Sequence, residues 1–316
     1  MTFINVKDNI NVVADGVSDD TAALQFCIDR AKDGGTVYFP DGTYLVSAAL
    51  IFYSNQTLKF DENARIRRSD KSVPLTRYLL ASYSEKEWSG YSGTHNVVIS
   101  GGIFDGNENL TEPSTLINTV HCKDVVIENC RFVNCSKWHC IELNSTENAT
   151  VRNCEFNGPA YVFRDVELKN EMIQIDRALE GSYGPVYNCD GTEIDFSRDG
   201  EICHNILVDS NKFRCDGFPA FGYHDDCNHS DITISNNVFK GSASSRGRSR
   251  GYIIFLSEAH SIRIVGNRFI APESADAPNI GIICENSDEN ALYCENNTFS
   301  GYFSDKLVRP ETDCKE

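Results

Sequence analysis

The sequence predicts an all-β protein, a single-stranded parallel β-helix (solenoid), and three observations lead to this fold class. A segment typified by residues 230–241, SDITISNNVFKG, occurs in seven versions whose phenylalanines lie 28, 24, 57, 26, 30 and 30 residues apart, and such a period is typical of a solenoid. Apolar residues alternate with polar ones in each version, as in a strand. A small or amide residue stands two positions before each phenylalanine, where a tight corner is needed. The phenylalanines are Phe104, Phe132, Phe156, Phe213, Phe239, Phe269 and Phe299.

One step, of 57 residues, is about twice the others. We therefore expect one coil to have lost its phenylalanine, and the run EMIQIDRA, residues 171–178, supplies a strand for it. The segment 179–203 that follows is rich in glycine and acidic residues, which predicts a loop. Loops on a rigid scaffold often carry function, so we expect this one to form a wall of a groove.

The N-terminal region predicts a helix within residues 13–33, capped by Asp19, Asp20 or Thr21 and ended by two glycines. Its expected apolar face consists of Ala22, Ala23, Phe26, Cys27 and Ala31. Residues 36–46, TVYFPDGTYLV, predict a strand, a turn and a second strand. The helix would cover the open end of the first coil. We expect one domain over residues 1–316, with an N-terminal cap (1–35), coils (36–303) and a C-terminal tail (304–316).

Residues 72–94 contain Tyr78, Tyr83, Trp88 and Tyr91 without regular alternation. This pattern predicts an excursion that lies against one face of the solenoid. Its aromatic rings could stack on sugars or could only pack the loop on the solenoid, and both interpretations stay open.

The strings ADGVSDDTAALQ and GGTVYFPDGTYLV carry a resemblance. They resemble the N-terminal segment of the pectate-lyase-like superfamily of right-handed parallel β-helix proteins, which includes polygalacturonase-like glycoside hydrolases, polysaccharide lyases, epimerases and phage tailspikes. The resemblance implies a right-handed β-helix with an N-terminal capping α-helix, acting on carbohydrate. It leaves the reaction open, because one fold hosts many chemistries. Of the four motifs of polygalacturonase-like members, only an Asp-Asp pair has a counterpart, Asp225-Asp226.

A net charge of −17 argues against nucleic acid or an anionic membrane as a partner. One exception is SRGRSRG, residues 245–251, which is either a solvated loop or an arm that grips an anion or another subunit. No apolar run is long enough to cross a bilayer. The N-terminus shows no secretory signal, so we expect a cytoplasmic protein, while a removed signal or a phage virion stays open.

The chain has 13 cysteines, and five of them fall at recurring repeat positions: Cys122, Cys130, Cys135, Cys140 and Cys154. Inward-facing free thiols are a better interpretation than a disulfide framework, because a chain this long does not need such cross-links. No Cys/His spacing is typical of zinc. We expect no metal and no cofactor.

The outward residues of neighbouring coils predict a group of carboxylates. Aligning residues 141–144 with 173–176 places Glu142 beside Gln174 and Asn144 beside Asp176. Since strands lie about 4.8 Å apart and alternate residues about 6.6 Å, Glu142 and Asp176 should be roughly 8 Å apart. Asp225 or Asp226 of the next coil should lie roughly 5 to 8 Å from Asp176.

Glycoside hydrolysis needs two carboxyl groups, about 5–5.5 Å apart for retention and about 6.5–9.5 Å for inversion. Like charges this close also raise the pKa of one carboxyl group while another stays ionised. We predict Asp176 and Asp225 or Asp226 as the catalytic pair, with Glu142 as a third carboxylate. Residues predicted to orient these groups or bind substrate are His224, Arg177, His139, Gln174, Asn144, Tyr223 and Glu258. A surface ion pair at Asp176-Arg177, a polar turn at residues 224–231 and a structural, buried His139 stay open as alternatives.

These observations predict a glycoside hydrolase that cleaves an oligo- or polysaccharide, as a monomer or homotrimer. A polysaccharide lyase or epimerase stays open, because Arg177 and the carboxylates could serve as base and calcium ligands. A non-catalytic glycan-binding or tailspike-like module is the third alternative.

Overall fold

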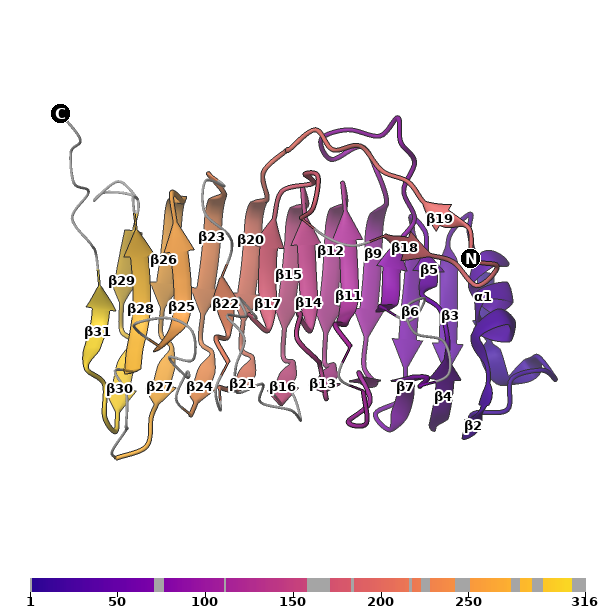
Figure 1. Ribbon diagram of the computed structural model, residues 1–316, viewed down its shortest axis with the longest axis horizontal. Helices are drawn as coiled ribbons and strands as arrows, with labels where there is room; N and C mark the ends of the chain where they lie inside the picture. Colours follow the sequence, from indigo (N-terminus) through magenta and orange to yellow (C-terminus); the bar gives the residue numbers. More distant parts are fainter. Residues whose placement is uncertain are drawn as a thin grey trace.

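The computed structural model describes residues 2–70, 77–110, 112–157, 171–182, 185–215, 218–222, 228–241, 251–273, 279–285 and 292–308. Three long sheets of parallel strands run along the molecule, and each coil contributes one strand to each sheet in turn (Figure 1). This arrangement confirms the predicted parallel β-helix. The first and last strands of the described chain, β1 and β31, lie toward opposite ends of the solenoid (Figure 1).

Sheet A has ten strands. They are β1 (Thr2–Asn5), β3 (Gly35–Phe39), β6 (Gln56–Phe60), β9 (His95–Ser100), β12 (Lys123–Glu128), β15 (Glu147–Arg152), β20 (His204–Asp209), β23 (Ser230–Ser235), β26 (His260–Val265) and β29 (Leu292–Glu295). Sheet B also has ten strands. They are β2 (Asp15–Asp19), β4 (Gly42–Val46), β7 (Ala64–Arg68), β10 (Ile103–Asp105), β13 (Arg131–Val133), β16 (Glu155–Asn157), β21 (Lys212–Arg214), β24 (Val238–Lys240), β27 (Arg268–Ile270) and β30 (Thr298–Ser300).

Sheet C has nine strands. They are β5 (Leu50–Phe52), β8 (Tyr78–Ser82), β11 (Thr115–Val120), β14 (Ile141–Asn144), β17 (Ile173–Asp176), β22 (Phe221–Gly222), β25 (Gly251–Ser257), β28 (Asn279–Glu285) and β31 (Asp305–Val308). The remaining elements are the helix α1 (Thr21–Asp29), the short 3-10 helix η1 (Val6–Asp8) and the antiparallel hairpin β18 (Val186–Tyr187) and β19 (Glu193–Ile194).

The repeat segment forms the strand of sheet A, a corner and the short strand of sheet B. At the corner, Asn236 takes a left-handed backbone with φ of 54°, a conformation that asparagine tolerates well. The next residue, Asn237, is fully buried, and its Oδ1 accepts a 2.8 Å hydrogen bond from the backbone N–H of Asn211. The same bond joins Asn237 to Asn267 and Asn267 to Asn297. A ladder of buried amides therefore fixes the register from coil to coil.

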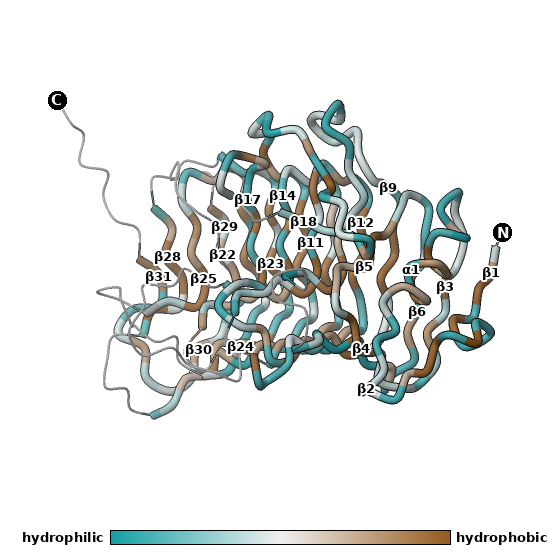
Figure 2. Tube along the Cα trace, turned by 45° about the vertical axis from the view of Figure 1, so that its right-hand side comes forward, coloured by the Kyte–Doolittle hydropathy of each residue, from teal (hydrophilic) through white to brown (hydrophobic). Residues whose placement is uncertain are grey.

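The phenylalanine of each repeat points inward and stacks on its neighbours. From Phe104 to Phe299, successive ring centroids lie 4.5–5.4 Å apart. Hydrophobic residues alternate with hydrophilic ones along the tube (Figure 2). The five repeat-position cysteines are buried free thiols in the same interior, as the sequence predicts.

The prediction that one coil had lost its phenylalanine is wrong. Strand β15 pairs directly with β20, and Phe156 of β16 stands directly opposite Phe213 of β21. The step of 57 residues is therefore a single coil. Strand β17, which carries EMIQIDRA, is the sheet C strand of that coil. The extra length lies in the segments before and after it.

The N-terminal helix is shorter than predicted, and only part of the predicted apolar face is buried, namely Cys27 and, just beyond the helix, Ala31. Its buried apolar residues are Leu24, Cys27 and Ile28, whereas Phe26 is 57% exposed. The predicted cap Asp20 does not accept from the helix but from the backbone N–H groups of Val13 and Ala14. The docked face is set by Gln25, whose amide exchanges two hydrogen bonds with the backbone of Ile51 in the first sheet C strand.

Paired strands extend beyond both ends of the predicted coils. Strands β1 and β2 precede residue 36, and β31 pairs with β28 beyond residue 303. Strand β8 also lies inside the predicted aromatic excursion, which therefore begins only at Tyr83. Among the described residues, no helix has the length and apolar character needed to span a bilayer.

Candidate functional site

The outer face of sheet C carries a polar cluster in its middle strands. In register along one row lie Ala81, Asn118, Glu142, Gln174 and Gly222 of β8, β11, β14, β17 and β22. The row is apolar at its N-terminal end, where Ala81 packs with Ile51. The predicted pairing of Glu142 with Gln174 and of Asn144 with Asp176 is the pairing in the structure. It was predictable because both strands alternate regularly at these positions.

Glu142 is held in a setting that favours its neutral form. Its side chain is 2% exposed, and one oxygen, Oε2, accepts a 3.0 Å hydrogen bond from the Thr115 hydroxyl. Burial, together with the nearby negative charge of Asp176, raises the pKa of Glu142 to about 7. The hydroxyl of Thr115 and the nearby amides of Asn144 and Asn118 act in the opposite direction and lower this pKa in part.

Asp176 has partners that favour a carboxylate. Its Oδ1 accepts a 2.7 Å hydrogen bond from the backbone N–H of Arg177, and its Oδ2 accepts from the Gln174 amide at 3.4 Å. The side chain of Asp176 is 4% exposed. It lies diagonally from Glu142, on the neighbouring strand and two residues beyond Gln174. A neutral donor and an ionised acceptor can thus stand side by side.

Glu171 is a third buried carboxylate on this face, and the sequence analysis missed it. Its Oε1 accepts a 3.0 Å hydrogen bond from the Tyr252 hydroxyl. A Cβ atom at position 222 would lie 2.8 Å from its Cγ, so the side chain crosses Gly222 closely. The signal that could have found it is the acid beginning EMIQIDRA, beside a glycine in the next strand.

His139 lies beside Glu171 as a neutral imidazole. Its Nδ1 donates to the backbone carbonyl of Glu171 at 2.6 Å, so its Nε2 carries the lone pair. Burial lowers the pKa of His139 to about 4. The predicted contribution of His139 to this cluster is therefore positional, through the backbone of Glu171.

Several buried polar atoms of the cluster have no hydrogen-bond partner among the residues that the structure describes. They are both amide atoms of Asn118, Oδ1 of Asn144 and Oε2 of Glu171. Unpaired buried polar groups are uncommon in folded proteins and cluster where a ligand or catalytic group is needed. A hydroxyl-rich ligand could supply the missing donors and acceptors.

Other predicted site residues lie apart from this cluster or outside the described residues. The Arg177 guanidinium turns toward the segment after β17, where its Nε donates to the Gly200 carbonyl at 2.5 Å. Glu258 lies in the turn after β25, half-buried, with a φ of 53°. Four predicted residues lie outside the described residues: Tyr223, His224, Asp225 and Asp226.

Two excursions border the cluster on its N-terminal side. The first is residues 83–94, between β8 and β9, and the second is the described part of residues 177–203, between β17 and β20. In the second, Val186 and Ile194 of the hairpin pack over Ile51 and Ala81 of sheet C. Phe196 packs on Val120, the neighbour of Asn144. The described part of this predicted loop therefore covers the strands next to the cluster, and the hairpin arches toward the N-terminal end (Figure 1).

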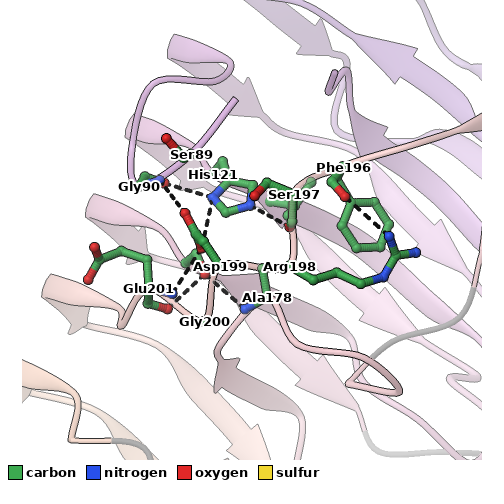
Figure 3. A network of polar contacts seen from close by, with 12 residues as sticks. Ser89, Gly90, His121, Ala178, Phe196, Ser197, Arg198, Asp199, Gly200 and Glu201 are labelled. Atoms are coloured by element: carbon green, nitrogen blue, oxygen red, sulfur yellow. Dashed lines mark hydrogen bonds and ion pairs between the residues drawn. The ribbon is translucent and has the colours of Figure 1, made fainter. Parts of the chain in front are cut away.

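His121 joins the two excursions. Its Nδ1 lies 2.8 Å from the carbonyl oxygen of Gly90 and its Nε2 lies 2.8 Å from that of Ser197 (Figure 3). The ring therefore lies between the two segments, with one nitrogen facing each carbonyl group. Asp199 lies 3.9 Å from Nδ1 and also accepts from the Gly90 backbone N–H at 2.6 Å. This clamp fixes both excursions beside sheet C.

Among the described residues, no three His, Cys, Asp or Glu side chains are placed to hold a metal ion. The chemistry of the cluster is that of carboxyl, amide and hydroxyl groups.

Comparison with known proteins places this chain in a family. A sequence model of the rhamnogalacturonase A/epimerase, pectate lyase-like family matches residues 3–173, more than half of the chain. The chain belongs to this family. Its members include proteins that bind or act on polysaccharides. The match includes β14 and the first residue of β17, so Glu142 lies within it.

Two curated relatives show the range of the family. The plasmin and fibronectin-binding protein A of Streptococcus pneumoniae is 30% identical over 296 residues, covering 85% of this chain and 39% of that protein. The mannuronan C5-epimerase AlgE1 of Azotobacter vinelandii is 60% identical over 45 residues, 14% of this chain and 3% of that protein. The chain thus spans well under half the length of either relative.

Solved structures agree on the fold. A family 28 exopolygalacturonase of Yersinia enterocolitica superposes with a TM-score of 0.55 at 13% identity, covering 98% of this chain and 77% of that one. At this identity the likeness shows the parallel β-helix alone.

Proposed function

We propose that this chain is a glycoside hydrolase whose acid catalyst is Glu142 and whose ionised partner is Asp176. The observation that carries the proposal is the register of the two carboxyl groups in adjacent strands, with the pKa of Glu142 raised to about 7. Raising the pKa of one carboxyl group beside an ionised one is how glycosidases obtain an acid at neutral pH. The family also supports an activity on polysaccharides.

In the proposed reaction Glu142 donates its proton to the glycosidic oxygen as the C–O bond breaks. Asp176 takes a proton from a water molecule, whose oxygen attacks the anomeric carbon. The leaving sugar thus gains a hydrogen and the other sugar gains a hydroxyl group. The strand geometry gives a diagonal of roughly 8 Å, which favours inversion.

The neighbouring polar groups support a sugar ligand. The amide of Asn118, Oδ1 of Asn144 and Oε2 of Glu171 lie near the two carboxyl groups and have no hydrogen-bond partner within the described part of the chain. Sugar hydroxyl groups both donate and accept, so they complement such atoms. In the wild-type chain these residues would orient the ring toward Glu142.

A lyase is less well supported by the contacts of Arg177. A lyase base must reach the acidic C–H of a uronate. The Nε of Arg177 instead donates to the Gly200 carbonyl. Its guanidinium is therefore engaged with the segment after β17.

A non-catalytic binding module is the second candidate function. Glu142 and Asp176 are 2% and 4% exposed, and substrate must reach both groups for catalysis. The relative from Streptococcus pneumoniae is named for binding plasmin and fibronectin. A binding module would use the outer surface and keep the carboxyl pair as a structural element.

The two candidates differ in product. The wild-type protein and the variants Glu142→Gln and Asp176→Asn would be incubated with a panel of neutral and acidic polysaccharides, and new reducing ends measured. The hydrolase proposal expects release by the wild type and a loss of about 100-fold or more in each variant. Glu128→Gln, on the outer face of β12, is the matched control and keeps full activity. Retention of a glycan without new reducing ends supports the binding module instead.

A further inference from the structure

The N-terminal end of the solenoid carries exposed apolar side chains that the proposed reaction does not use. Phe3 of β1, Ile10 of the turn after η1 and Phe26 of α1 are 64%, 95% and 57% exposed. We call these three residues the N-terminal patch, because they line one pocket of about 400 Å³ at the end of the solenoid where β1 and α1 lie (Figure 2). Single exposed apolar residues are ordinary, whereas several large ones gathered in one place mark an interaction surface.

The N-terminal patch is built on a fixed backbone. The Nδ2 of Asn9 donates to the Ala23 carbonyl of α1 at 3.3 Å, so the turn that carries Ile10 is tied to the helix. Phe3 stacks on Tyr38, with ring centroids 6.0 Å apart. A preformed surface of this kind loses little conformational entropy when a partner docks on it.

The size of the patch suits a contact between proteins. At about 180 Å² for a fully exposed large apolar side chain, the three residues expose roughly 400 Å². One partner in a standard interface buries about 800 Å², of which a little over half is apolar. The patch therefore supplies the apolar centre of one such interface, and the polar residues around it supply the rim.

Two charges of opposite sign lie beside the patch. Asp8 and Arg30 are exposed and line the same pocket, and neither makes an ion pair with a residue that the structure describes. A two-fold axis through the patch pairs Asp8 of one copy with Arg30 of a second copy, and the reciprocal pair forms at the same time. A partner that carries charge of one sign would be repelled by one of these two groups. The charges therefore favour a second copy of this chain.

The open edge of β1 is self-complementary in the same way. Within the described part of the chain, β1 is the first strand of sheet A and pairs with β3 alone. Its sequence, TFIN, has no lysine or proline of the kind that protects a strand edge from pairing. Two copies of one edge pair antiparallel about a two-fold axis. The edge and the charges thus require the same symmetry.

We propose that the N-terminal patch is the interface of a dimer, in which two copies of this chain are joined end to end about a two-fold axis. The two solenoids extend away from the interface in opposite directions. This dimer differs from the monomer or homotrimer that the sequence predicts. Strands β14 and β17, which carry the carboxyl cluster, lie in the middle of sheet C and outside the interface. The proposal therefore does not depend on the hydrolase activity.

Sedimentation of the full chain at increasing concentration measures its molar mass. The wild type should approach the mass of two chains. Ile10→Asp should raise the dissociation constant at least tenfold, because it places a charge at the apolar centre of each half of the interface. The matched control is Leu307→Asp, at a residue of β31 that is 37% exposed at the other end of the solenoid. It should keep the wild-type constant.

Charge reversal tests the two-fold geometry. Asp8→Lys and Arg30→Glu each set like charges against one another in the homodimer, so each should weaken the dimer at least tenfold. An equimolar mixture of the two variants should regain the dimer, because both pairs across the interface then join opposite charges. Thermal unfolding of each variant checks that it is folded.

Three results would overturn the proposal. The first is a wild-type mass of one chain at a concentration of about 100 μM, or a mass of three or more chains. The second is equal weakening by Ile10→Asp and Leu307→Asp, which would show a head-to-tail contact instead. The third is a mixture of the two charge variants that stays monomeric. Reducing-end release is measured separately, so failure of the hydrolase proposal leaves this test intact.

Discussion

At the scale of single residues, Glu142 links stability to pH. Its pKa rises from 4.5 for the free side chain to about 7 in the fold. The folded state therefore binds a proton that the unfolded state releases, and stability is lost as pH rises from 4.5 through 7. At about 1.4 kcal/mol per pH unit, the loss from this group is about 3 kcal/mol above pH 7.

Glu142→Gln removes this loss, because glutamine does not titrate. We expect the variant to exceed the wild type in free energy of unfolding by up to about 3 kcal/mol at pH 8, and by little at pH 4. Urea denaturation of both proteins at the two pH values measures the difference. A stability difference that is the same at pH 4 and pH 8 would show that Glu142 keeps an ordinary pKa.

Gly222 makes room for Glu171. In Gly222→Ala, the new Cβ would lie 2.8 Å from Cγ of Glu171 and displace that side chain from the Tyr252 hydroxyl. We expect catalysis to fall by about tenfold or more while the fold remains, because the displaced carboxylate lies beside the catalytic pair. Kinetics and thermal unfolding of the variant check both parts.

Tyr252→Phe is the companion to this prediction. It removes only the hydroxyl group that Glu171 accepts from. If Glu171 positions the substrate, both variants reduce activity in the same direction. Unchanged activity in both would assign Glu171 a purely structural role.

Residue-level predictions from the sequence succeeded where alternation is regular. The pairing of Glu142 with Gln174 follows from the period of two in both strands. Glu171 could not be assigned to the outer face, because Met172 and Ile173 both point inward and break the alternation. Close approach of Glu171 to Gly222 depends on three-dimensional register, which one strand alone does not show.

At the scale of elements, the ladder of buried asparagines holds the corners. Asn237→Ala would leave the Asn211 N–H without its acceptor and the Val208 carbonyl without its donor. We expect a loss of about 3 kcal/mol in the free energy of unfolding, from two buried groups left unpaired. Chemical denaturation measures it.

Asn297→Ala is the control for the ladder, since Asn297 is its half-buried end member. Water can replace its hydrogen bonds, so the loss should be smaller. Equal losses at positions 237 and 297 would contradict a buried, cooperative ladder.

A second prediction concerns the contacts of His121 with the two excursions. His121→Leu removes the donors to Gly90 and Ser197 and leaves two carbonyl oxygens unpaired. We expect limited proteolysis to cut the two excursions, around residues 85–92 and 188–200, faster than in the wild type. The coils should stay intact. The control His260→Leu changes an exposed histidine at the start of β26, away from both excursions. Cleavage of the two excursions at the same rate in both variants would contradict the role of His121.

Element positions were largely predictable, but their number and faces were not. The repeated phenylalanine and asparagine positions predict where the strands of sheets A and B lie. The step of 57 residues predicts two coils where the structure has one, because sequence length does not distinguish a coil from an insertion. The helix has apolar residues on more than one face, and the contact of Gln25 with Ile51 decides which face docks.

At the scale of the whole molecule, stacked coils place different chemistry on different sheets. Sheet C carries the carboxyl cluster, whereas the outer positions of sheet B hold more basic than acidic side chains. The solenoid fold and the superfamily could be predicted from the repeats and the N-terminal segment. The reaction could not, because the family contains enzymes and binding proteins on one scaffold.

The most direct test of the central claim is the pH dependence of glycan cleavage by the wild type and Glu142→Gln. On a polysaccharide that the wild type cleaves, activity should fall as pH rises through about 7, because Glu142 loses the proton it donates. Glu142→Gln should lose about 100-fold or more, and its residual activity should lack the alkaline fall. Full activity in the variant, or the same alkaline fall in both proteins, would contradict Glu142 as the acid.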